Sequence, residues 1–322
     1  MRLSRAKIST THQAKKQQGV AIITALLIVT IAATVSIAIS TRLQLDIRRT
    51  GNLIAQDQAL FYIMAAEEWS QRILRQDKKD SSIDSLDESW ATELPPLPVD
   101  GGTIQGKLTD LQACININSL VDKNAVNATT KTRLSQLFAK LKISGDLTQA
   151  IADWIDTDME ASTPNGAEDD YYLNLESPYR TANTALQSIS ELRLIKGFED
   201  SVIYNRVKPY LCAYPNTNGI TAVNINTASA EVLQSLSTDM TEEIANNILE
   251  HRAEEAFKDI KEFTGFANIE SLKKAENIST GSDYFLLRTQ AIIGQANMVM
   301  YSIIYRDAEG KTTIVSRTQR TL

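Results

Sequence analysis

The feature that most constrains this chain is an uninterrupted apolar stretch near its N-terminus, GVAIITALLIVTIAATVSIAIST, over residues 19–41. From Val20 onward it carries no formal charge and consists mostly of Val, Ile, Leu and Ala. A helix over residues 20–41, rising about 1.5 Å per residue, reaches roughly 33 Å and can cross the hydrocarbon core of a bilayer. The stretch therefore predicts one membrane-spanning helix at the start of the chain.

Charge is distributed unequally across this stretch. Five cations precede it and no acid occurs before Asp46; the cations are Arg2, Arg5, Lys7, Lys15 and Lys16. An excess of Lys and Arg beside a membrane helix holds that flank in the cytoplasm. We therefore expect the N-terminus in the cytoplasm and a folded part, after residue 80, outside it.

Three interpretations of the apolar stretch compete. A secretory signal peptide has a shorter apolar core, of about 7–15 residues. Small residues near the end of the stretch (Ser36, Ala38 and Ser40) would nevertheless suit cleavage there. A plain membrane anchor fits the length well. The third interpretation rests on the junction KKQQG-VAIITALLIV, where a basic leader ends in glycine immediately before the apolar helix.

That junction resembles the type IV prepilin signal, which a dedicated prepilin peptidase cuts after the glycine on the cytoplasmic side. The resemblance implies cleavage between Gly19 and Val20. Two residues depart from the family pattern. The usual glutamate at the fifth mature position is Thr24 here, and the usual phenylalanine at the first is Val20.

The composition is that of a folded, acidic body behind the apolar stretch. Hydrophobic residues make up 43% of the chain and charged residues 22%, as in ordinary globular proteins. Removing residues 1–19, with their five cations and no acid, changes the net charge from −6 to −11. An acidic surface argues against a polyanionic partner such as DNA and suits the binding of cations.

Cysteine and histidine are scarce. Cys114 and Cys212 are the only two cysteines, and in an oxidising compartment an isolated pair most simply forms one disulfide. Two buried free thiols are the alternative. The histidines are His12, in the leader, and His251, so the mature body cannot assemble a histidine metal site or catalytic dyad. We also find no motif that pairs a nucleophile with a base, and expect no enzymatic activity.

The apolar helix is expected to continue to about residue 76. Residues 42–76 lack proline and are rich in helix-forming residues, with one apolar stripe formed by Leu43, Ile47, Ile54, Phe61 and Met64. At about 1.5 Å per residue, a helix over 20–76 measures roughly 85 Å. Residues 77–100 are polar and then rich in proline, which predicts a linker.

The remaining chain alternates between strand and helix patterns. A strand is expected from Gly102 to about Ile117, followed by a helical block to residue 213. Residues 220–275 read as further helices, and Asn224-Ile225-Asn226 echoes Asn116-Ile117-Asn118, a weak indication of internal duplication. Three segments rich in Tyr, Ile, Val and Thr, over 284–293, 297–306 and 312–321, predict an antiparallel meander.

The densest chemical signal is the acidic segment DWIDTDMEASTPNGAEDDYY, over residues 153–172. Alternating acids, a Pro-Asn-Gly turn and a second acid cluster would let carboxylates converge on a hard cation such as Ca²⁺. A solvated acidic loop is the alternative, which composition alone favours slightly. A glycosidase-like pair of carboxylates is disfavoured, because nothing orients such a pair.

A second signal is the run VNINTASAEVLQSLSTDMTEEIANNILEHR, which is similar to the helix-hairpin-helix modules of DNA-uptake proteins. Those modules present backbone N–H groups and basic side chains to a phosphate. Here the hairpin reads Ser237-Thr238-Asp239-Met240, without glycine, and residues 220–275 hold ten acids and five bases. We expect a packing and interaction module. A membrane-anchored DNA-binding protein of an uptake system is the alternative function.

The leader ending in Gly19, Thr24 in place of glutamate, and the motifs DWIDTD, GAEDDYY, SELRLIKGF and VNINTASAEVL, in that order, resemble the type II secretion K subunit. The resemblance spans residues 16–320. It implies an α+β, pilin-like fold, in which a long N-terminal helix packs on an antiparallel sheet and a large all-helical domain is inserted before the C-terminal strands.

The same resemblance implies function. It indicates a minor pseudopilin of the inner membrane, with its C-terminal domain in the periplasm, which caps the pseudopilus tip together with the minor pseudopilins I and J. It also implies calcium in the acidic segment, which we assign to Asp156, Asp158, Glu168 and Asp170. The expected regions are a leader (1–19), the N-terminal helix (20–76), a linker with the first strand (77–118), the inserted helical domain (119–283) and the C-terminal strands (284–322).

Overall fold

The computed structural model describes residues 14–93, 95–143, 147–215, 220–274 and 277–319. The chain divides into two compact units, Met1–Asp57 and Gln58–Leu322. Most of the expected leader, residues 1–13, lies outside the described residues.

The first unit is dominated by helix α1 (Ala14–Asp80), which continues into the second unit. From Gly19 it contains a window of mean hydropathy 2.6 that is long enough to cross a membrane and is not buried by the rest of the protein. Five of its hydroxyl groups donate to carbonyls of the same helix, those of Thr24, Thr30, Thr34, Ser36 and Thr41. Thr24 Oγ1, for example, donates to Val20 O (3.1 Å) and Ala21 O (3.0 Å). The carbonyls of the helix thus satisfy these hydroxyl groups, which need no polar neighbour outside it.

Helix α1 ends four residues later than expected, at Asp80 rather than at residue 76. Lys78 and Lys79 lie in its last turn, where cations complement the negative end of the helix dipole. Residues 77–80 of the predicted polar linker therefore belong to helix α1.

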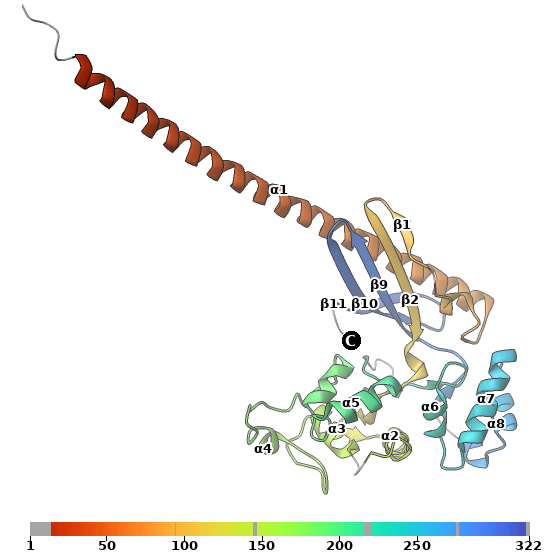
Figure 1. Ribbon diagram of the computed structural model, residues 1–322. Coiled ribbons are helices and arrows are strands. Elements are labelled where there is room, and N and C mark those ends of the chain that lie inside the picture. The colour runs from red at the N-terminus through yellow and green to blue at the C-terminus, as the bar shows by residue number, and fades with distance from the viewer. Residues whose placement is uncertain (1–13, 94, 144–146, 216–219, 275–276, 320–322) are drawn as a thin grey trace, which may run out of the picture. The chain divides into compact units, whose positions relative to one another are not determined.

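The second unit contains a five-stranded antiparallel sheet (Figure 1), in the order β1-β2-β9-β10-β11. Its strands are β1 (Leu97–Val99), β2 (Gly102–Asp110), β9 (Tyr284–Ile293), β10 (Ala296–Arg306) and β11 (Thr312–Gln319). Although β2 and β9 pair directly, more than 170 residues separate them in the chain, and these residues form the helical insert. This confirms the expected α+β, pilin-like class.

The C-terminal part of α1 packs on this sheet. Leu74 lies in one core cluster with Leu108 of β2 and Phe285 and Leu287 of β9, and all four are buried. An ion pair also joins α1 to β11, because the buried Glu67 carboxylate accepts from Arg317 at 2.9–3.0 Å through both of its oxygens. Because Glu67 is 3% exposed, this paired geometry is needed to offset its desolvation.

Two expectations about strands were wrong. The first strand ends at Asp110, not near Ile117, because the Asp110 side chain accepts from Gln112 N at 2.7 Å and caps the 3₁₀ turn η2 (Leu111–Ala113). The proline-rich segment is also more than a linker, since it contains η1 (Ser89–Ala91) and β1. Pro98 is tolerated in β1 because this strand lies at the edge of the sheet.

The insert is made of short helices around one buried core. Its α-helices are α2 (Ala128–Lys140), α3 (Thr148–Ile155), α4 (Asp169–Tyr172), α5 (Ser201–Val207), α6 (Ala230–Gln234), α7 (Glu242–Glu254) and α8 (Ile260–Ala267). The 3₁₀ turns are η3 (Ile117–Leu120), η4 (Ile189–Leu194), η5 (Lys208–Tyr210) and η6 (Glu270–Lys274). Two-residue strands complete it: β3 (Ile115–Asn116), β4 (Val121–Asp122), β5 (Ala125–Val126), β6 (Leu211–Cys212), β7 (Val223–Asn224) and β8 (Ile278–Ser279).

The echoed Asn-Ile-Asn motif starts each half of the insert. In the first half, Asn116 Oδ1 accepts from Asn118 N (3.2 Å), and the Asn118 side chain bonds to both the N–H (2.8 Å) and the carbonyl (2.9 Å) of Leu186. A parallel β3–β6 pair lies beside it.

The second half repeats these contacts. Asn224 Oδ1 accepts from Asn226 N (3.0 Å), and the Asn226 side chain bonds to both the N–H and the carbonyl of Phe257, each at 3.0 Å. A parallel β7–β8 pair lies beside it. The sequence echo therefore corresponds to a repeated structural unit.

Candidate cation site

The acidic segment gathers its carboxylates where helix α3 ends. Asp156 is the C-terminal cap of α3 in extended backbone, so that Asp156 and Asp158 follow it at alternate positions, and Glu168 immediately precedes α4. One carboxylate oxygen from each of Asp156, Asp158 and Glu168 lies within 4.8 Å of the others. Three carboxylates at this spacing suit a cation that is bound by oxygen ligands.

Several oxygens of this cluster are buried without a partner. Among the described residues, Asp156 Oδ1, both Glu168 carboxylate oxygens and Asp153 Oδ1 are buried without a hydrogen bond of normal length, and only the Thr181 hydroxyl lies near Glu168 as a donor. Asp156 is 9% exposed and Glu168 is 4% exposed. Each unsatisfied buried acceptor costs about 1–3 kcal/mol, and more when charged. The arrangement is therefore unfavourable for the bare anions and fits a bound cation.

The cluster also shifts proton affinity. Burial, reinforced by Asp153, Asp156 and Asp158, raises the pKa of the Glu168 carboxyl to about 7. Burial and the charges of Asp158 and Asp153 raise the pKa of Asp156 to about 6. Both carboxyls therefore take up and release their protons close to neutral pH. A cation must compete with protons for them.

The loop that carries these acids is fastened to α3 by two side chains. Asp153 Oδ2 accepts from Ser162 N (2.9 Å) and Ala167 N (2.8 Å). Gln149 accepts from Asn165 N (3.1 Å) and donates to the Thr163 carbonyl (2.8 Å). The helix thereby closes residues 156–167 into a defined loop.

Gly166 is required by the close approach of this loop to α3. A Cβ at this position would overlap Asp153 Oδ2 and the backbone of Ser162. Lys196 Nζ donates to the Gly166 carbonyl at 3.1 Å and lies 4.9 Å from the centroid of the Tyr171 ring. The second acid cluster is thus held against the first by contacts made before any ion binds.

The structure brings together Asp156, Asp158 and Glu168 but not Asp170. Asp170 is exposed in the first turn of α4 and lies outside the clustered group. The intervening Asp169 is engaged with Arg180 Nη1 (3.0 Å) and with Thr181.

Asp153, which the expected set omits, also lies outside the group within 4.8 Å, but it is fully buried and its charge acts on Asp156 and Glu168. The signal was present in the sequence, because Asp153 lies three residues before Asp156 and thus on the same side of the helix end. Its free Oδ1 is buried, while Oδ2 holds the loop.

A second acidic group already has its partners within the protein. Oxygens of Asp77, Asp84 and Glu88 also lie within 4.8 Å of one another. The fully buried Arg306 bonds to Asp77 at 2.8 Å and to both oxygens of Asp84 at 2.6 Å. Glu88 accepts from Ser85 N and Trp90 Nε1, each at 2.9 Å. A guanidinium therefore occupies the place of a metal ion.

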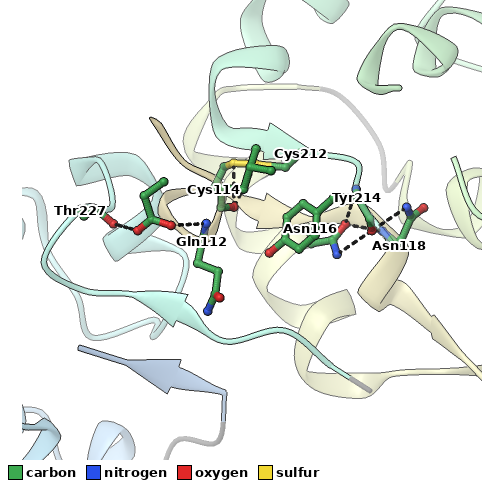
Figure 2. Close-up of a disulfide and its surroundings, with 9 residues drawn as sticks. Gln112, Cys114, Asn116, Asn118, Cys212, Tyr214 and Thr227 are labelled. Carbon is green, nitrogen blue, oxygen red and sulfur yellow. Dashed lines mark hydrogen bonds between the residues drawn. A yellow bond between two sulfur atoms is a disulfide. The ribbon is translucent and has the colours of Figure 1, made fainter. Parts of the chain in front are cut away.

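Figure 2 shows Cys114 and Cys212 joined as a disulfide, with their Cα atoms 5.9 Å apart. The pair lies beside the parallel β3–β6 ladder, and each sulfur is 3.3 Å from the Leu111 carbonyl oxygen. It would link the beginning of the insert to the end of its first half, 98 residues later.

The hairpin of the helix-hairpin-helix-like module carries acids where a phosphate would bind. Met240 is fully buried at this turn, and Ser237 Oγ bonds to Ser271 Oγ at 2.8 Å. Asp239 is exposed directly before α7, which opens with Glu242 and Glu243. Three acids at one helix N-terminus repel phosphate, so the module keeps the scaffold without phosphate-binding chemistry.

An antiparallel sheet packed on the end of a long N-terminal helix, with a helical insert between paired strands, defines a protein of the pilin-like class. The apolar part of that helix is consistent with a single membrane anchor. Two family models match this insert, both described as type II secretion system protein K, over residues 113–216 and 223–281. The chain belongs to the type II secretion system protein K family, whose members are structural proteins without enzymatic activity.

Relatives and a solved structure agree with this assignment. The type II secretion system protein K of Aeromonas hydrophila is 32% identical over 94% of this chain and 97% of its own length. That of Pseudomonas aeruginosa is 32% identical over 94% of this chain and 92% of its own length. A chain in the crystal structure of the GspK–GspI–GspJ complex from enterotoxigenic Escherichia coli matches with a TM-score of 0.72 and 26% identity, over 85% of this chain and 100% of that one.

Proposed function

We propose that this protein is the minor pseudopilin that caps and initiates the type II secretion pseudopilus, as part of the machinery that exports folded proteins across the outer membrane. Its helix would lie in the inner membrane and its folded part in the periplasm. The observation that carries the proposal is the likeness to a chain of the GspK–GspI–GspJ complex over that chain's whole length. By this likeness the partners are the minor pseudopilins I and J of the same system.

The N-terminal helix supports a position at the tip. In repeating pilin subunits a buried glutamate at the fifth position pairs with the terminal ammonium of a neighbour, whereas here Thr24 bonds to carbonyls of its own helix. A tip subunit has no such neighbour above it, and an unpaired carboxylate in lipid would be costly. The insert between β2 and β9 adds bulk where a further subunit would stack.

Processing by the prepilin peptidase between Gly19 and Val20 belongs to the same proposal. The two residues lie in exposed helix, and the basic leader precedes them. Cleavage there would leave Val20 as the first residue of the membrane helix and Thr24 as the fifth.

Calcium is the ion that fits the acidic cluster best. We infer that Asp153, Asp156, Asp158 and Glu168 would hold it. Oxygens of Asp156, Asp158 and Glu168 lie within 4.8 Å of one another, and Asp153 Oδ1 is buried without a partner. A hard cation that accepts six to eight irregular oxygen ligands suits a loop of this kind better than Mg²⁺, which demands near-octahedral geometry. The ion would neutralise the acids and fix residues 156–168 against α3.

The assembly proposal is tested by co-purification. The full-length processed protein, solubilised in a neutral detergent, is mixed with the minor pseudopilins I and J of its own system and analysed by size exclusion with light scattering. A ternary complex of defined mass is expected. Failure to form it with each subunit folded and calcium present would contradict the proposed partners.

A further inference from the structure

We infer that the first half of the insert carries a docking surface for an acidic protein segment that also bears apolar side chains. The surface is formed by the end of α2, the turn η4 and the run α5–η5, and we call it the basic face. Its cations are Lys140, Lys142, Arg193, Arg206 and Lys208. This inference is independent of the proposed tip position, because it rests on the insert alone.

The three elements form one continuous surface. Arg206 of α5 donates to the carbonyl of Leu141 at 3.3 Å, which places it beside Lys140 and Lys142 at the end of α2. Arg193 of η4 lies 5.8 Å from the centroid of the Tyr204 ring, and Lys208 lies 5.6 Å from the same centroid. Arg193 and Lys208 therefore flank one half-buried tyrosine, and Arg206 connects the same helix to the end of α2, which carries Lys140 and Lys142.

These cations are not neutralised by the part of the chain that the structure describes. None of the five forms an ion pair with a described carboxylate. The acids that are near them in sequence hold backbone groups instead: Glu191 accepts from Gln187 N and Ser188 N, Glu199 from Gly197 N, and Asp200 from Val202 N. These three carboxylates keep their charge, but five cations outnumber them, so the face keeps an excess of positive charge for an external anion.

The contrast with the rest of the body indicates which partner can approach here. The body without its leader carries a net charge of −11, so most of its surface repels an acidic partner. Five exposed cations without described acidic partners create the opposite potential in one place. An acidic partner is thereby steered to this face and away from others.

The apolar and aromatic side chains that accompany the cations favour a protein partner over a phosphate ligand. Leu194 (45% exposed) follows Arg193 in η4, and Val202 (58% exposed) lies two residues before Tyr204 in α5. Arginine, tyrosine and exposed aliphatic side chains together are the composition of protein interfaces. A phosphate site instead gathers donors on one point, whereas these cations are spread around apolar groups.

The test uses the full-length processed protein in phosphatidylcholine nanodiscs, with calcium present. The probe is a fluorescent peptide in which glutamate alternates with leucine, and binding is measured by anisotropy. R193E/K208E should weaken binding by about tenfold or more, since both cations are reversed. The matched control K261E/K311E changes the net charge equally on exposed lysines elsewhere and should weaken binding less than about twofold.

Two further comparisons separate docking from bulk electrostatics. L194S/V202S should weaken binding of the Glu-Leu peptide but leave that of poly-glutamate unchanged, and R193K/K208R should bind as the parent does. Thermal melts establish that each variant is folded, and R193Q/K208Q replaces the charge reversal if that variant unfolds. Equal losses in R193E/K208E and K261E/K311E would overturn the inference. Competition by dihexanoyl phosphatidylglycerol or inorganic phosphate as effective as that by poly-glutamate would also overturn it, in favour of a phosphate ligand.

Discussion

Protons and calcium should compete for the carboxylates of Glu168 and Asp156, so the calcium affinity should depend on pH. With the pKa of Glu168 near 7 and that of Asp156 near 6 before the ion binds, most of both carboxyls are ionised at pH 7.5. At pH 5.5 only about 3% of Glu168 and about a quarter of Asp156 remain ionised. Calcium must displace the protons from both, so its affinity should fall by about a hundredfold between these pH values.

This loss of affinity can be expressed as stability. At a calcium concentration a hundredfold above the Kd at pH 7.5, binding to the folded state adds about 2.7 kcal/mol. The same concentration at pH 5.5 is close to the Kd and adds only about 0.4 kcal/mol. For a folded part of this size, the difference in Tm between calcium and chelator should shrink from about 5–10 °C to about 1–2 °C.

In chelator alone the pH dependence has the opposite sign. The folded-state pKa values of Glu168 and Asp156 are raised above their unfolded values, so the folded protein binds more protons between about pH 4 and pH 7. Their contribution without calcium is therefore unfavourable at neutral pH and is relieved as the pH falls. Asp77 and Asp110, whose pKa values burial also raises, act in the same direction and cancel from the calcium-minus-chelator difference.

The assay is a thermal melt of the full-length processed protein in detergent at pH 5.5, 6.5 and 7.5, with calcium, magnesium or chelator. Asp156→Asn and Asp153→Asn should remove most of the calcium shift at pH 7.5. Asp170→Asn is the matched control, because it removes an exposed carboxylate outside the cluster, and should keep the shift. A calcium shift that does not depend on pH, or that disappears in Asp170→Asn alone, would refute the assignment.

Four other outcomes are expected. Arg306→Met leaves Asp77 and Asp84 buried without their cation and should destabilise the protein by about 3–5 kcal/mol, partly recovered at pH 5.5; full stability in urea titration at pH 7.5 would contradict this. Gly166→Ala forces the loop away from Asp153 and should cost about 1–3 kcal/mol and most of the calcium shift, whereas Gly265→Ala, at a site with open space, should keep that shift. Thiol labelling of the native exported protein should modify neither Cys114 nor Cys212, and labelling of both would show free thiols. Mass analysis of the membrane form should find Val20 at the N-terminus, and a start after Ala38 or Ser40 would indicate a secretory signal peptide instead.

Patterns that depend on neighbours in the chain predicted the outline of the fold well. The apolar stretch is visible because every residue of a membrane helix meets the same solvent, and the C-terminal strands because alternation is a local property. The strand over 284–293 has the bounds that its pattern predicts. The acidic cluster was also located, since Asp156, Asp158 and Glu168 converge around a turn that is readable in the sequence.

Features decided by long-range contacts were missed. The Asp110 carboxylate, whose cap on the following turn ends the first strand, is held in place by Asn224 and Ser282, more than a hundred residues away. Spacing alone does not show which carboxylates are turned inward, so the burial of Asp153 and the exposure of Asp170 could not be predicted from the sequence. Strand β1 was not predicted, because it contains Pro98. Only the order of the strands shows that β1 lies at the edge of the sheet, where proline is tolerated.

The central claim, a cap at the tip of the pseudopilus, is tested most directly by locating the protein on assembled fibres. Fibres from cells that overproduce the major pseudopilin are labelled with gold-conjugated antibody against the helical insert and examined by electron microscopy. We expect label at one end of each fibre and none along its length. Label distributed along the fibres would show a repeating subunit and would contradict the account.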